Sequence, residues 1–154
     1  MCYRYMLAAV VVVLAIACGG SNKELTETEY LESVSQINNP SLDAYHRIED
    51  LLNQVINRPA LISNSTWEAD FAQAVSEINN NLIKARKIDP PAALEKAHRV
   101  FLQALECMAD SPPKVRSAIE SRSASDLASA TDFASSCGDL WGDALDALKD
   151  ATGS

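Results

Sequence analysis

Four cysteines and two histidines are the side chains of this 154-residue sequence that are best suited to covalent or metal chemistry. No two cysteines form a Cys-x-x-Cys redox pair, and no histidine lies in a His-Glu-x-x-His zinc motif or a Cys-x-x-Cys-His haem motif. The sequence also lacks a Gly-x-Ser-x-Gly nucleophile turn and a glycine-rich phosphate loop. We therefore expect no catalytic residues, no metal site and no cofactor, and we do not expect an enzyme.

Cys107 and Cys137 are the two cysteines with the most informative spacing. Arg122 is midway between them, at a position where the sequence predicts a turn between two helices. In an antiparallel helical hairpin, two residues equally distant from the turn lie at the same height. The spacing therefore predicts a Cys107–Cys137 disulfide, as is typical of proteins in an oxidising compartment. The alternative is two buried free thiols that pack as small apolar side chains.

The two histidines each lie within a predicted helix. His98 is at the edge of an apolar stripe, where we expect a hydrogen bond to a carboxylate, and His46 has the same interpretation. A weak zinc site would require both histidines to converge with Glu49 or Glu95. Nothing in their spacing requires that convergence.

The N-terminal segment has an unbroken apolar run from Met6 to Ile16, preceded by Arg4. This run is shorter than the 20 or so residues that a bilayer requires, and it is typical of a secretory signal. The residues Ala15-Ile16-Ala17-Cys18 resemble the lipobox of bacterial lipoproteins, with Ala15 in place of the usual Leu. The resemblance implies that the signal is cut before Cys18 and that the Cys18 thiol carries the lipid that anchors the protein to a membrane.

This interpretation divides the chain into a signal peptide (1–17), a lipidated cysteine with its tether (18–25) and a helical domain (26–150). Seven extended residues reach about 25 Å, so the domain would lie close to the membrane surface. Two alternatives remain. In one, an ordinary secretory signal is cut near Ala17 and Cys18 has no role. In the other, the apolar segment is an uncleaved anchor.

The rest of the chain lacks the alternating pattern of strands and predicts four helical segments. The first begins after Thr26, which forms a capping box with Glu29. Pro40 lies within this segment, and we expect a kink or a short break there. The apolar stripe consists of Leu31, Val34, Tyr45, Ile48, Leu52 and Val55.

The second segment begins near Ser65, which we expect to cap it together with Glu68, and it ends before Asp89. Asp89 is then the expected N-cap of the third segment, with Pro90 as its first residue. Ser111-Pro112-Pro113 predicts a break or kink in this segment, after which it continues to Ile119.

The fourth segment begins around Ser123 to Ser125, and its apolar stripe repeats every three or four residues. Short connections between long amphipathic helices predict an all-α fold: an up-and-down bundle of about four helices, some of them kinked at prolines. Trp67 and Trp141 are expected core residues. The fourth stripe consists of Leu127, Ala130, Ala134, Cys137, Trp141, Ala144 and Leu148.

The formal net charge of −8 argues against nucleic-acid binding, which requires clustered basic residues. The last helix has an acidic face that suits either solubility or a basic partner: Asp139, Asp143, Asp146 and Asp150. We expect a lipoprotein of the bacterial cell envelope, anchored on the extracytoplasmic side of a membrane. We expect the domain to act as a non-enzymatic interaction or structural module whose partner is an envelope protein. The alternative is a helical bundle that binds a small ligand or a metal.

Overall fold

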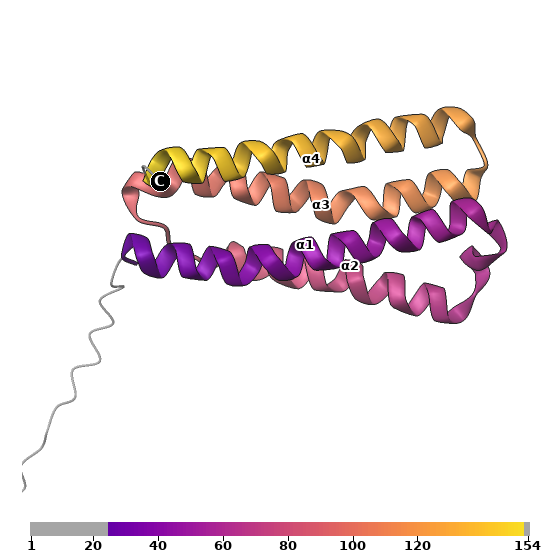
Figure 1. Cartoon of the computed structure of the whole chain (residues 1–154), viewed down its shortest axis with the longest axis horizontal. Coiled ribbons are helices and arrows are strands. Elements are labelled where there is room, and N and C mark those ends of the chain that lie inside the picture. Colours follow the sequence, from indigo (N-terminus) through magenta and orange to yellow (C-terminus); the bar gives the residue numbers. More distant parts are fainter. Residues whose placement is uncertain (1–24, 153–154) are drawn as a thin grey trace, which may run out of the picture.

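The computed structural model describes residues 25–152, which form helices and connecting turns without any strand. The four α-helices run side by side with alternating chain direction (Figure 1). The predicted all-α, up-and-down bundle is confirmed. In chain order the elements are α1 (Glu27–Asn57), η1 (Pro59–Ser63), α2 (Ser65–Ala85), η2 (Ala92–Leu94), α3 (Glu95–Ser121) and α4 (Ala124–Thr152), where η denotes a short 3-10 helix.

The two ends of the bundle differ in what they carry. One end, here called the tether end, holds the start of α1, the connection between α2 and α3 and the last turn of α4 (Figure 1). The opposite end, here called the turn end, holds η1 and the turn between α3 and α4. The predicted signal peptide, Cys18 and the tether up to residue 24 lie outside the described residues.

The four helices do not pack equally against one another. α3 packs most closely against α4 and also contacts α1 and α2, whereas α1 packs mainly against α2. α1 and α4 are not a closely packed pair. α3 is therefore the central helix of the bundle, and α1 and α4 lie on either side of it.

α1 begins as the sequence predicts. The Thr26 hydroxyl accepts a hydrogen bond from the Glu29 backbone N–H, and the Glu29 carboxylate accepts one from the Thr26 backbone N–H at 2.8 Å. These two bonds satisfy backbone donors that the first turn of a helix cannot pair internally. The predicted capping box is confirmed.

Of the kink or short break expected at Pro40, the break is wrong, because α1 continues from Glu27 to Asn57 with Pro40 inside it. Pro40 removes one backbone donor, but residues on both sides of it are buried and hold the helix against its neighbours. The buried face is also rotated by about one residue from the predicted stripe in the first half of the helix. There Tyr30, Ile37 and Ala44 are buried, while Leu31 and Tyr45 are only partly buried.

α2 begins at the predicted residue but with a different cap. The Asn64 side-chain oxygen accepts hydrogen bonds from the backbone N–H groups of Thr66 and Trp67, at 3.0 and 3.1 Å. Asn64 is therefore the N-cap, and Ser65 is the first helical residue. The predicted cap at Ser65 is therefore wrong by one residue, and Asn is as favourable as Ser at this position.

α3 begins later than predicted, at Glu95 rather than after Asp89. Pro91 is extended (φ −53°, ψ 144°), and a proline also disfavours helical geometry in the residue before it. Pro90 therefore cannot begin the helix, and the single turn of η2 comes first. Of the break or kink expected at Pro112 and Pro113, the break is wrong, because α3 continues through both residues to Ser121.

The predicted stripes form one continuous core, with Trp67 and Trp141 buried as expected. The α4 stripe is reproduced from Ala130 to Leu148, with Leu127 and Ala134 partly buried at its edge. Within residues 25–152, no helix is both long and apolar enough to cross a membrane.

Candidate functional site

The structure joins Cys107 and Cys137 in a disulfide between α3 and α4, with their Cα atoms 5.3 Å apart. Arg122, the residue midway between them, has left-handed backbone geometry (φ 54°) and ends α3. The Ser123 hydroxyl then accepts a hydrogen bond from the Asp126 backbone N–H in the first turn of α4. The predicted pairing is confirmed, whereas lipidation of Cys18 remains a prediction.

His98 differs from expectation, because its partner is a phenol and not a carboxylate. Its Nδ1 atom shares a hydrogen bond of 3.2 Å with the hydroxyl of Tyr30, and both side chains are buried between α1 and α3. Burial lowers the pKa of His98 and raises the pKa of Tyr30 to about 12. The pair is therefore neutral near pH 7, and its polar atoms satisfy each other within the core.

His46 is exposed on α1, where its Nδ1 atom lies 3.1 Å from a carboxylate oxygen of Glu49. It follows Tyr30, the partner of His98, by sixteen residues, which is about 24 Å along a helix. The two histidines therefore do not converge, and Glu95 does not bring them together. Within residues 25–152, no group of three or more His, Cys, Asp or Glu side chains is arranged to hold a metal ion.

An open groove runs between α1 and α4 toward the turn end, and we call it the α1–α4 groove. It consists of two adjoining hollows of about 420 and 710 Å³. Ile56 lines both hollows, and its side chain is 53% exposed although it is large and apolar. The groove exists because α1 and α4 flank α3 without packing closely against each other. Its floor is formed by α3 residues Ser111, Val115, Ala118 and Ile119.

Most of the groove surface is apolar, but its two ends carry different charges. Glu49 and Asp50 line the hollow nearer the tether end. Arg122 lines the larger hollow, beside Glu120, whose carboxylate accepts a hydrogen bond from Arg116 at 2.8 Å. One end therefore has two exposed carboxylates, of which Glu49 lies beside His46, while the opposite end has one carboxylate and one guanidinium group.

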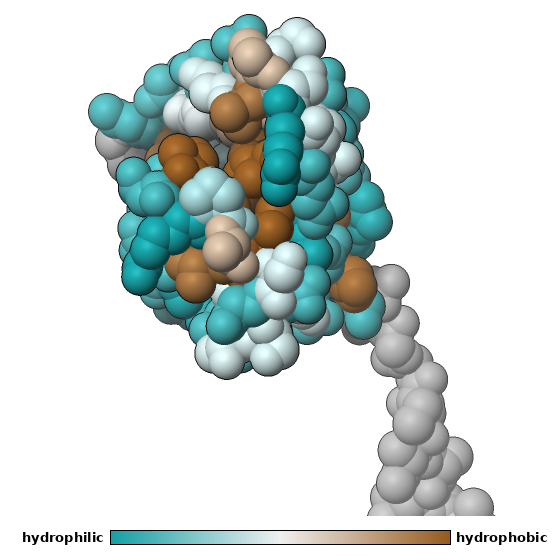
Figure 2. Space-filling view, turned by 90° about the vertical axis from the view of Figure 1, so that its right-hand side faces the viewer, coloured by the Kyte–Doolittle hydropathy of each residue, from teal (hydrophilic) through white to brown (hydrophobic). Residues whose placement is uncertain are grey.

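Apolar side chains are also visible when the bundle is viewed from its turn end. Figure 2 shows brown side chains gathered in a hollow on this face, with hydrophilic side chains around them. The larger hollow of the groove opens at this end, where η1 contributes Pro59 and Ile62. A recessed apolar surface with a polar rim is a common form of binding site.

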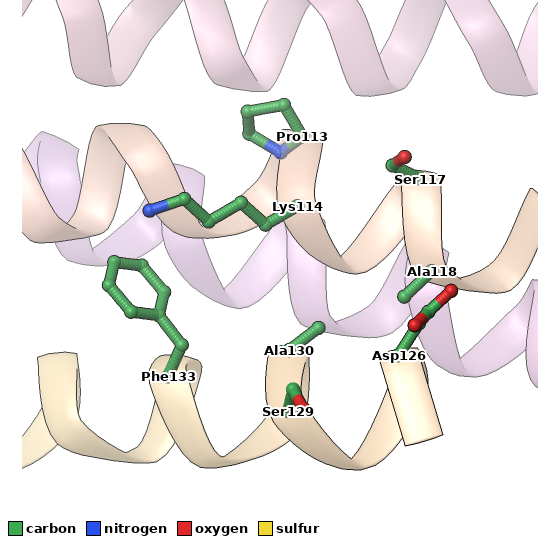
Figure 3. A pocket seen from close by; sticks show the side chains of 8 residues that line it. All are labelled: Pro113, Lys114, Ser117, Ala118, Asp126, Ser129, Ala130 and Phe133. Carbon is green, nitrogen blue, oxygen red and sulfur yellow. The ribbon is translucent and has the colours of Figure 1, made fainter. Parts of the chain in front are cut away.

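A separate hollow of about 580 Å³ lies between α3 and α4, and it includes Phe133. Figure 3 shows the Lys114 side chain extending from α3 over the ring of Phe133. The ammonium nitrogen is 3.5 Å from the ring centroid, which is a favourable cation–π geometry. The aromatic surface here is already covered, so this hollow is a weaker candidate than the α1–α4 groove.

The predicted acidic face of α4 is exposed at all four aspartates, and none of them lines the groove. Sequence reasoning did not identify the groove. The available signal was Ile56, a large apolar residue adjacent to the buried stripe position Val55. Ile83 and Leu145 give the same signal outside the groove, so that signal alone does not locate a site.

No protein-family model matches the chain, and comparisons with curated proteins and with solved structures find no significant similarity.

Proposed function

We propose that this protein is a bacterial lipoprotein, anchored through Cys18 on the extracytoplasmic side of a membrane, whose helical domain is a non-enzymatic interaction module. The domain would bind an envelope protein through the α1–α4 groove. The observation that carries this role is the groove itself, which exposes Ile56 between two helices in the half of the bundle away from residue 25.

The location is supported by the disulfide together with the leader. Disulfides persist in oxidising compartments and are rare in the cytoplasm. The Cys107–Cys137 bond therefore agrees with export, which the apolar run before Cys18 also indicates. Stable anchoring requires more than one acyl chain, and the modified cysteine of bacterial lipoproteins supplies it.

The orientation of the groove suits a module that meets a partner away from its own membrane. α1 spans about 46 Å from Glu27 to Asn57, since a helix rises by 1.5 Å per residue. A chain held at Cys18 would therefore carry the turn end tens of ångströms from the attachment point.

Intact-mass analysis of the native protein tests the anchor. The expected product begins at Cys18 and carries the mass of its acyl groups, and Cys18→Ala abolishes both the added mass and the recovery in membranes. A retained leader or a free thiol at Cys18 would refute the anchor.

Photo-crosslinking in intact cells tests the role. A photoreactive residue at position 56 is expected to give a discrete envelope adduct, whereas the same residue at position 83 gives none. Ile56 and Ile83 are similarly exposed (53% and 50%), so the comparison isolates the groove. Equal adducts from both positions would refute the groove as the interaction surface.

A further inference from the structure

We infer that the α1–α4 groove binds one amphipathic helix of a partner polypeptide, about three turns long, with basic residues in its first turn. This inference rests on the proposed interaction role and specifies the partner that the groove accepts. It follows from the length and spacing of the groove walls, from the exposed apolar surface and from the charges at the two ends.

The groove is about as long as the site that one additional short helix would occupy. Its floor runs along α3 from Ser111 to Ile119 and ends at Arg122, which is about 16 Å or three turns of helix. The walls present residues three or four apart, the spacing of the ridges that interdigitate when helices pack. These residues are Tyr45, Ile48, Leu52 and Ile56 on α1, and Leu127, Thr131 and Ala134 on α4.

The small side chains of the α4 wall would allow a docked backbone to approach closely. Ala124 and Ala134 line this wall, and Ile56 projects from the opposite one. Burial of Ile56 by an apolar stripe at i, i+3, i+4 and i+7 follows the general mode in which an amphipathic helix binds a hydrophobic groove.

The charges at the two ends of the groove determine which charge the partner helix carries and in which direction it docks. Glu49 and Asp50 are both exposed at the end of the groove nearer the tether end, whereas Arg122 and Glu120 have opposite charges at the other end. A helix has a partial positive charge at its N-terminus and a partial negative charge at its C-terminus. The partner therefore docks parallel to α1, with basic residues beside Glu49 and Asp50, and the net charge of −8 favours the approach of a basic segment.

The tether of the protein itself does not suit this position. Ile56 follows residue 25 by almost the whole length of α1, about 45 Å, whereas the seven residues 18–24 extend at most about 25 Å. A lipid on Cys18 of the same chain would therefore have to fold back along the bundle to reach the groove.

A labelled synthetic peptide tests the inference. The probe has about four helical turns, an apolar stripe, lysines in its first turn and a staple on its polar face to keep it helical. Fluorescence anisotropy measures its binding to the full chain in nanodiscs of zwitterionic lipid. Binding is expected to weaken at least about tenfold in Ile56→Glu and to remain unchanged in Ile83→Glu.

Charge reversal tests the direction of docking. Glu49→Lys with Asp50→Lys should weaken binding of the lysine peptide and restore binding of a matched peptide that has glutamates in its first turn. Asp146→Lys with Asp150→Lys makes the same change in net charge outside the groove and should leave the preference for the lysine peptide unchanged. If both double variants act equally, binding depends only on net charge and the inference is overturned.

Three further results would overturn the inference. The first is failure of the peptide to bind the wild-type chain. The second is that palmitate binds saturably, that Ile56→Glu abolishes this binding, and that the peptide does not bind. This result would make the groove a lipid site. The third is a dimer that only Ile56→Glu dissociates, which would make a second copy of this chain the occupant of the groove.

Failure of this inference can be distinguished from failure of the proposed function. An envelope adduct from position 56 without peptide binding would preserve the interaction role and reject only the helical, basic partner.

Discussion

Removal of the disulfide should lower the stability of the bundle by an amount that the loop length predicts. Cys107 and Cys137 are separated by 30 residues, and the chain-entropy relation for a closed loop of that size gives about 3.6 kcal/mol. This stabilisation arises mainly in the unfolded chain, which the bond prevents from exploring open conformations. For a domain of this size, such a loss lowers the melting temperature on the order of 10–15 °C.

Urea unfolding measures this loss with two signals, far-ultraviolet circular dichroism for helix content and tryptophan fluorescence for packing. Both tryptophans are buried, Trp67 on α2 and Trp141 one turn after Cys137 on α4, so the emission reports loss of packing at both helices. The variant Cys107→Ala/Cys137→Ala and the reduced wild type should both unfold at a urea concentration about 2 M lower than the oxidised protein.

The reduced wild type is the critical control, because it retains both sulfur atoms and loses only the covalent bond. A difference below about 1 kcal/mol between the oxidised and reduced proteins would refute the loop-entropy reasoning. It would indicate that the unfolded α3–α4 hairpin remains closed without the disulfide. If only the alanine variant loses much unfolding free energy, the loss arises from altered packing around Cys137 and not from the covalent bond.

The remaining predictions concern one turn, one buried histidine and one helix cap. Arg122→Gly should stabilise the protein by about 0.5–1 kcal/mol in urea unfolding, because glycine adopts the left-handed geometry without a steric penalty. Burial lowers the pKa of His98, so as the pH falls this residue takes up a proton in the unfolded chain at a higher pH than in the folded protein. The unfolding free energy should therefore decrease below about pH 6.5, by at most about 1.4 kcal/mol per pH unit, and His98→Gln should remove this component. Asn64→Ala should cost about 1 kcal/mol, because two backbone N–H groups lose their acceptor.

Three matched variants serve as controls. Arg99→Gly, within α3 and exposed, should destabilise by about 1 kcal/mol, and a loss at position 122 as well would contradict the left-handed turn. His46→Gln removes the exposed histidine, and an equal effect of both histidine variants on the pH dependence would exclude burial as the cause. Ser65→Ala should change stability little, and a larger loss there than at Asn64 would restore Ser65 as the cap.

The local features of this fold could be predicted from the sequence, because they depend on residues a few positions apart. The capping box at Thr26 and the apolar periodicity of α4 require only neighbouring residues to specify them. The disulfide was also predictable, since equal distances from one short turn determine which residues of a helical hairpin face each other. Cys107 and Cys137 meet for this reason.

The tertiary structure decided the features that depend on several helices at once. Pro40 and Pro112 remain within helices because packing on both sides holds the backbone in place, although the sequence allowed a break as well as a kink at each site. His98 bonds to Tyr30 because a rotation of α1 by about one residue brings that phenol inward. The groove at Ile56 depends on how far α1 lies from α4, which no single amphipathic stripe encodes. Helix positions follow from local periodicity, whereas the surface available to a partner follows from the relative placement of helices distant in sequence.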